Sequence, residues 1–142
     1  CNSRIVARKK VFQMKTPATY GLTHIAIAAR DLQKTKAFYQ QVFDMEVMYE
    51  ESDFIQLTTP GAHHILVFGK ARNSTGKTGG IAHFGFRLRN PKDIGIMEEK
   101  IKKAGGRIES QGEFLPGSPY IFFRDPDGYE VEVWFELLTD PT

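Results

Sequence analysis

Three residues that commonly bind metal ions, His24, His83 and Glu132, lie on short β-type segments of this sequence. Successive side chains of a strand point to opposite faces of its sheet, so each segment has two distinct faces. In all three segments the bulky apolar residues share one face and the metal-competent residue lies on the other. Two neutral imidazoles and one carboxylate suit zinc, iron, manganese or nickel. The pattern predicts one divalent metal ion, with coordination positions left open for water and substrate.

The face neighbours of the two histidines are small residues, Ala26, Ala28 and Gly85. They would leave room for a ligand above the sheet. Taken singly, each histidine is more often an ordinary hydrogen-bonded residue than a metal ligand. The joint placement of all three residues is what favours a metal site.

The last strands carry further candidates for this site. Four residues are expected to bind substrate, since aromatic side chains supply much of the contact area in small-molecule sites: Tyr120, Phe122, Arg124 and Trp134. For Phe122 and Trp134, packing in the core is an equally good interpretation. Glu130 shares a strand face with Glu132, and both carboxylates are candidate catalytic groups.

The elements that must position these residues form a duplicated pattern. Helical spacing of apolar residues predicts helices at about 32–43, capped by Asp31, and at about 92–104, between Pro91 and two glycines. Strands are expected at 22–29, 45–50, 53–59, 63–68, 81–88, 107–112, 119–124 and 129–136. Each half reads strand, helix and three strands. We therefore predict an α+β fold of two βαβββ modules.

These modules define the expected domain organisation. Residues 17–138 would form a single domain, with module one at 20–69, a connector at 70–80 and module two at 81–136. The N-terminal arm, 1–16, is expected to lie outside the core.

The connector contains Gly76-Lys77-Thr78, which satisfies a loose phosphate-binding loop pattern. Such loops need a following helix to receive phosphates, and here the chain continues into a predicted strand. Nucleotide binding is therefore disfavoured. We expect the connector to lie at the mouth of the cavity.

Composition narrows the class of protein. The 142 residues are 41% hydrophobic and 25% charged, as in ordinary globular domains, and the formal net charge is only +2. Much of the basic excess lies in the first ten residues, which argues against nucleic-acid binding.

No apolar run approaches the length of a membrane span. The one cysteine, Cys1, cannot form an internal disulfide, so a cytoplasmic location is expected. We interpret Cys1 as the boundary of a partial gene product. A lipidated N-terminal cysteine is the less favoured alternative.

From about residue 20 to 136 the sequence resembles the vicinal oxygen chelate superfamily, which includes glyoxalase I, extradiol dioxygenases, fosfomycin-resistance transferases and bleomycin-resistance proteins. Three segments carry the resemblance: Gly-Leu-Thr-His24-Ile-Ala-Ile, Gly80-Ile-Ala-His83-Phe and Asp125-Pro-Asp-Gly-Tyr-Glu-Val-Glu132. The resemblance implies paired βαβββ modules forming a curved, partly closed sheet around a metal and ligand cavity. It places the metal ligands on His24, His83 and Glu132.

The sequence also departs from these relatives. Glyoxalase I usually has a fourth, carboxylate ligand on the fourth strand of its first module. Here that strand, 63–68, has no acid, and the ligand position aligns with Ile65 or Leu66, or with His64 if the register slips. Phe122 stands where extradiol dioxygenases and fosfomycin transferases have a tyrosine. Ala26 replaces a threonine of the fosfomycin transferases.

The favoured interpretation is a metal-dependent lyase, isomerase or thiol transferase acting on a small oxygen-bearing substrate. The alternative is a drug-sequestering protein of the bleomycin-resistance kind, which typically lacks the metal residues. Because each module would leave a sheet edge and a concave face uncovered, a homodimer is also expected.

Overall fold

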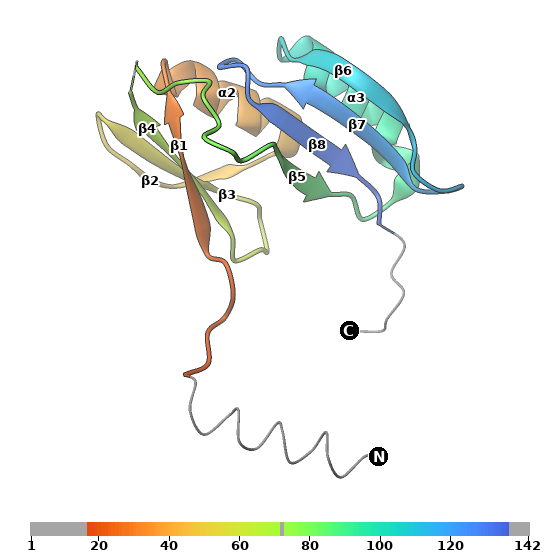
Figure 1. Ribbon diagram of the computed structural model, residues 1–142, viewed down its shortest axis with the longest axis horizontal. Coiled ribbons are helices and arrows are strands. Elements are labelled where there is room, and N and C mark those ends of the chain that lie inside the picture. Colours follow the sequence, from red (N-terminus) through yellow and green to blue (C-terminus); the bar gives the residue numbers. More distant parts are fainter. Residues whose placement is uncertain (1–16, 72, 137–142) are drawn as a thin grey trace.

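The computed structural model describes residues 17–71 and 73–136, and these contain both predicted modules (Figure 1). Module one comprises β1 (His24–Ala29), α2 (Leu32–Phe43), β2 (Glu46–Glu50), β3 (Phe54–Thr58) and β4 (Ile65–Lys70). Module two comprises β5 (Phe84–Arg87), a 3-10 turn (Pro91–Asp93), α3 (Ile94–Lys103), β6 (Arg107–Glu113), β7 (Pro119–Arg124) and β8 (Glu130–Trp134). The α+β class and the βαβββ order are confirmed. The predicted arm at 1–16 lies outside the described residues, and the domain boundaries stay a prediction.

Both modules form a four-stranded sheet with the same topology. The strand order is β1-β4-β3-β2 in module one and β5-β8-β7-β6 in module two. The first strand of each module pairs in parallel with the fourth, and the other pairings are antiparallel. The first strand therefore lies at a sheet edge, and β8, which carries Glu132, lies directly beside β5.

The helices begin and end close to the capping residues that the sequence predicted. The Asp31 side chain caps α2 by accepting hydrogen bonds from two backbone N–H groups, and α2 ends at Asp44, which has a left-handed φ of 52°. The helix predicted from residue 92 begins as α3 at Ile94, because residues 91–93 form a 3-10 turn capped by the Asn90 side chain. None of the helices in the described ranges is long and apolar enough to cross a membrane. The expected cytoplasmic location stays a prediction.

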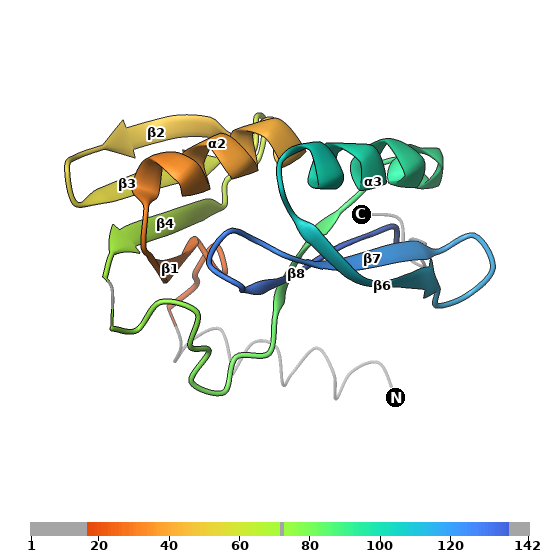
Figure 2. The ribbon, with the colours of Figure 1, turned by 90° about the horizontal axis from the view of Figure 1, so that it is seen from above.

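The two modules share one apolar core. Figure 2 shows α2 and α3 lying end to end along one side of the molecule. Aromatic residues of α2 contact module two. The Phe43 and Phe86 rings stack with centroids 3.8 Å apart, and Phe38 lies 6.1 Å from Phe123. These contacts bury aromatic area from both modules in one cluster, which fixes how the modules sit relative to each other.

The turn between β7 and β8 ties module two to module one. Four hydrogen bonds that involve side chains join this turn to module one: Tyr39 to Asp125 (2.8 Å), Thr35 to Asp127 (3.3 Å), the Arg30 backbone N–H to Asp127 (3.2 Å) and Tyr129 to the Ala28 carbonyl (2.7 Å). Asp125 is 5% exposed and Tyr39 is fully buried. This turn therefore holds the start of β8 against the end of β1.

The prediction of a curved, partly closed sheet is wrong. In the described chain, β1 pairs only with β4 and β5 pairs only with β8, so two separate open sheets result. The physical reason is that the helices and the β7–β8 turn, rather than strand pairing, join the modules. Three strands also begin two or three residues later than predicted, at His24, Ile65 and Phe84 instead of residues 22, 63 and 81.

Candidate active site

The first strand turns its isoleucines to the core, as predicted. Ile25 and Ile27 pack against the buried cluster, whereas His24 and Ala26 are exposed on the opposite face. His24 Nδ1 lies 3.0 Å from the hydroxyl of the neighbouring Thr23. The imidazole therefore has local support and stays accessible from solvent.

Module two presents the second histidine and the carboxylate on one face. Phe84 and Phe86 pack against the core, while His83, directly before β5, and Gly85 are exposed on the other side. Gly85 pairs in register with Glu132 of β8. A Cβ at position 85 would lie 3.3 Å from a Glu132 carboxylate oxygen. Because glycine has no Cβ, it avoids this close contact with the carboxylate.

Three ionisable groups interact on this face. Burial raises the pKa of the Glu132 carboxyl, His83 opposes that shift, and Glu130 adds to it. His83 Nδ1 lies 3.8 Å from Glu130 Oε1. A cation bound here would favour the ionised form of Glu132, because it would offset the cost of burying the charge.

The predicted substrate-binding residues lie on the same face of this sheet. Across the β7–β8 pair, Tyr120 is opposite Trp134, Phe122 is opposite Glu132, and Arg124 is opposite Glu130. All four are half-buried and none belongs to the buried core cluster, so core packing does not account for Phe122 or Trp134. The Phe122 ring meets His83 edge-on at 5.1 Å. Their contact with substrate stays a prediction.

Arg124 already has several protein partners. Its guanidinium donates to Glu130 (3.1 Å), to Glu109 (3.2 Å) and to the Gly128 carbonyl (3.1 Å). This arginine holds the Glu130 carboxylate in place beside His83. We therefore interpret it as a residue that orients Glu130.

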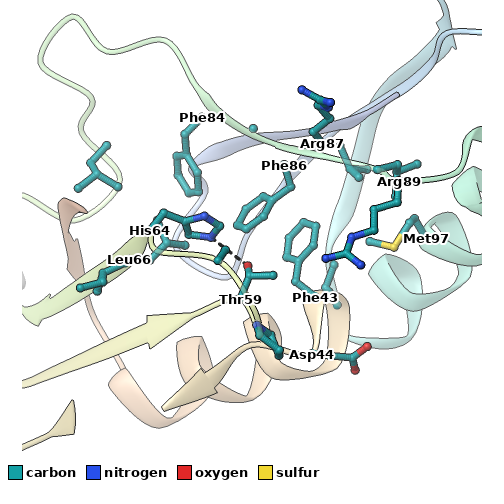
Figure 3. Close-up of a pocket in the computed structure, with 18 of the residues that line it drawn as sticks. Phe43, Asp44, Thr59, His64, Leu66, Phe84, Phe86, Arg87, Arg89 and Met97 are labelled. Carbon is teal, nitrogen blue, oxygen red and sulfur yellow. Dashed lines mark hydrogen bonds between the residues drawn. The ribbon is translucent and has the colours of Figure 1, made fainter. Parts of the chain in front are cut away.

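Sequence reasoning missed a cavity of about 850 Å³ between the modules, on the core side of β5 (Figure 3). Phe43, Phe84 and Phe86 form its apolar wall. His64 also lines the cavity, and its Nε2 lies 2.9 Å from the Thr59 hydroxyl. The phenylalanines were predicted to face the core. The space itself arises where the end of α2 meets β5, a junction that sequence periodicity does not reveal.

The predicted metal ligands do not come together in a single chain. His24 lines the 850 Å³ cavity, whereas His83 and Glu130 line a different one of about 230 Å³. Within residues 17–71 and 73–136, no three His, Cys, Asp or Glu side chains are grouped closely enough to hold a metal ion. One chain thus supplies donors of suitable chemistry, but it does not bring the predicted set of three together.

Comparison with known proteins identifies the fold family. The family model for the glyoxalase/bleomycin resistance protein/dioxygenase superfamily matches residues 21–133. The chain belongs to this superfamily. The match spans both modules and all three predicted ligands.

The relatives within the superfamily are diverse. A manganese-dependent 2,3-dihydroxybiphenyl 1,2-dioxygenase from Geobacillus genomosp. 3 is 26% identical over 80% of this chain, which spans only 36% of that enzyme. The uncharacterised protein PA2024 of Pseudomonas aeruginosa is 28% identical over 78% of the chain and 85% of its own length.

Solved structures share the fold. The fosfomycin resistance protein FosX of Listeria monocytogenes, crystallised with Mn(II), superposes with a TM-score of 0.72 at 24% identity, covering 85% of this chain and 94% of FosX. Lactoylglutathione lyase from Agrobacterium tumefaciens gives a TM-score of 0.66 at 19% identity, covering 84% of this chain and 96% of the lyase.

The strand register shows which residue occupies the place of a fourth ligand. Gly85, two residues after His83, pairs with Glu132, and Ala26, two residues after His24, pairs with Val67. Val67 is therefore the counterpart of Glu132 in module one. The predicted alignment with Ile65 or Leu66 is off by one or two residues, and Leu66 faces the core at 5% exposure. No carboxylate occupies this position.

Proposed function

We propose that this protein is a metal-dependent enzyme of the superfamily, with lyase, isomerase or thiol-transferase chemistry on a small oxygen-bearing substrate. The observation that carries the proposal is the arrangement of His83, Glu130 and Glu132 on one face of the module-two sheet, with Glu132 largely buried and its pKa raised. Perturbed acidic groups of this kind cluster at functional sites.

We further propose that a second copy of the chain completes the site. The ligand set would be His83 and Glu132 of one subunit with His24 of the partner subunit. The exposed position of His24 supports this arrangement, as does the finding that the described part of one chain groups no three candidate metal ligands. The edges of β1 and β5 lack strand partners within the described residues, and the nearby apolar residues Leu22 and Ile81 are 96% and 57% exposed.

The bound metal would act as a Lewis acid on substrate oxygens, and zinc, nickel, manganese or iron would fit the donor set. The remaining chemistry falls to the protein. Glu130 can accept or return a proton, because Arg124 holds its carboxylate next to His83. Gly85 keeps the space beside Glu132 open, so that the carboxylate can turn towards a ligand.

A subunit-mixing experiment tests this proposal. Wild-type protein should bind about one Mn²⁺ per chain, and His24→Ala and Glu132→Ala should each lower the affinity by roughly 100-fold or more. In a co-expressed heterodimer of the two variants, one site would combine His24 of the Glu132→Ala chain with the intact His83 and Glu132 of its mate. We expect half the wild-type Mn²⁺ stoichiometry, measured by titration calorimetry.

No recovery in the heterodimer would disprove a shared site, and stoichiometric metal on the His83→Ala protein would disprove the ligand set. His63→Ala is the matched histidine control, because His63 is exposed and lies before β4. It should bind Mn²⁺ as wild type does. A metal-free wild-type protein would favour the alternative, a non-catalytic protein that sequesters a small molecule.

A further inference from the structure

The 230 Å³ cavity beside His83 and Glu130 has a second wall, built by the connector between the modules. Ser74, Lys77 and Thr78 of the connector line it, together with residues Ile25 to Ala28 of β1. The sequence disfavours nucleotide binding by Gly76-Lys77-Thr78 and predicts that the connector lies at the mouth of the cavity. In the fold, this segment lies next to the candidate active site.

The connector is anchored where it crosses the cavity. Thr75 is 8% exposed and its hydroxyl donates to the Ala71 carbonyl. Gly76 has a φ of +81°, and a Cβ there would lie 2.9 Å from the Asp127 carbonyl oxygen. Only glycine fits this close approach, so the turn holds Lys77 and Thr78 in place beside the cavity.

The charges of the two walls differ. Within the described residues Lys77 forms no ion pair, so its ammonium is available at the connector wall. On the module-two wall, the charge of Glu130 is balanced by Arg124 at 3.1 Å. A ligand between these walls meets one uncompensated cation and two hydroxyls on one side, and an imidazole and a carboxylate on the other. An anionic group would be recognised at the connector wall.

The volume limits the size of the ligand. A water molecule occupies about 30 Å³ of liquid, so 230 Å³ corresponds to a ligand of roughly eight heavy atoms. That is far too small for a nucleoside triphosphate. The apolar walls contributed by Ile25, Ile27 and Ile81 suit a short carbon skeleton.

We propose that Lys77 recognises the anionic group of the substrate, so that the enzyme acts on a compact oxyanion, a carboxylate of a few carbon atoms being the simplest case. This proposal rests on the function proposed above and names its substrate class. Ser74 and Thr78 supply hydroxyl donors beside the ammonium. His83 and Glu130 face the remainder of the substrate.

The test uses propionate as an anionic probe and propionamide as its uncharged counterpart of the same shape. Binding to the metal-free full chain is followed by ¹H–¹⁵N NMR shifts. Wild-type protein should bind propionate at least about tenfold more tightly than propionamide. Lys77→Gln should remove that preference, and Lys77→Arg should restore most of it. Lys70→Gln is the matched control, because Lys70 is an exposed lysine at the start of the same connector. It should behave like wild type.

The proposal is overturned if propionamide binds as well as propionate, if neither binds, or if Lys70→Gln loses as much as Lys77→Gln. Mn²⁺ titration of the same proteins separates this result from the proposed function. Lys77→Gln should bind Mn²⁺ like wild type. Propionate binding that depends on Lys77 in a protein that binds no metal would leave the anion site standing and overturn the metal enzyme.

Discussion

At the scale of single residues, the candidate chemistry depends on what surrounds each carboxylate. Glu132 is 9% exposed and Glu130 is half-exposed and paired with Arg124. The raised pKa of Glu132 reflects the cost of burying a charge without enough compensation. The position equivalent to Glu132 in module one is Val67, which cannot ligate a metal or move a proton.

We expect weak or no turnover of the methylglyoxal–glutathione adduct, because Val67 offers no carboxylate to act as base. Ring cleavage of simple catechols is also expected to be absent, since Phe122 cannot titrate. Assays would use protein loaded with nickel, zinc, manganese or iron(II). Val67→Glu should raise turnover of the adduct at least about tenfold, while Val47→Glu, a control on exposed β2, should not. Wild-type turnover above roughly 10 per second would contradict this prediction.

At the scale of elements, the β7–β8 turn is a structural link between modules. Its Asp125 is almost fully buried and accepts a hydrogen bond from Tyr39 on α2. Burial raises the pKa of Asp125, and the Tyr39 hydroxyl opposes that shift by stabilising the ionised carboxylate. Because the pKa of Asp125 is higher in the folded protein than in the unfolded chain, the free energy of unfolding falls as the pH rises and Asp125 ionises. The hydrogen bond from Tyr39 makes this fall smaller.

Tyr39→Phe keeps the buried ring and removes only the hydroxyl. We expect the free energy of unfolding to fall by about 1–3 kcal/mol at about pH 8, because Oδ2 of the buried Asp125 carboxylate then loses the Tyr39 donor. The loss should be smaller at low pH, because a protonated carboxyl no longer depends on the Tyr39 donor in the same way. Urea denaturation at both pH values measures this. Tyr49→Phe, on an exposed hydroxyl, should change stability by less than about 0.5 kcal/mol. Equal losses at the two pH values would contradict the argument.

At the scale of the whole molecule, β1 and β5 each have one strand edge that pairs with no other strand within the described residues. The adjoining apolar residues Leu22 and Ile81 are 96% and 57% exposed, so each offers apolar area beside a strand edge that a partner could cover. Both observations favour association with a second chain through these edges. The same association would bring His24 to the face that carries His83 and Glu132.

We expect a dimer in sedimentation velocity at micromolar concentration. Leu22→Asp combined with Ile81→Asp should weaken dimerisation by roughly tenfold or more, because it places charges in the apolar interface. Ile96→Asp is the control: this residue of α3 is 60% exposed and lies away from both edges. Dimerisation unaffected by the double variant would place the interface elsewhere. A monomer that still binds metal would overturn the shared site.

The sequence alone determined the local features of this protein. Cap residues and apolar spacing located α2 to the residue, and strand alternation put His24, His83 and Glu132 on faces opposite the core side chains. These features depend on residues close together in the chain, so they leave a periodic signal. The same reasoning indicated that module one lacks a fourth carboxylate.

The tertiary structure decided how the modules meet. Aromatic packing between α2 and β5, and the hydrogen bonds of the β7–β8 turn, set the sheets side by side without strand pairing. That arrangement leaves the three predicted ligands ungrouped within the described part of one chain and creates the two cavities between the modules. It also anchors Lys77 beside the smaller cavity. Such features depend on contacts between residues up to a hundred positions apart, and periodicity within one segment carries no information about them.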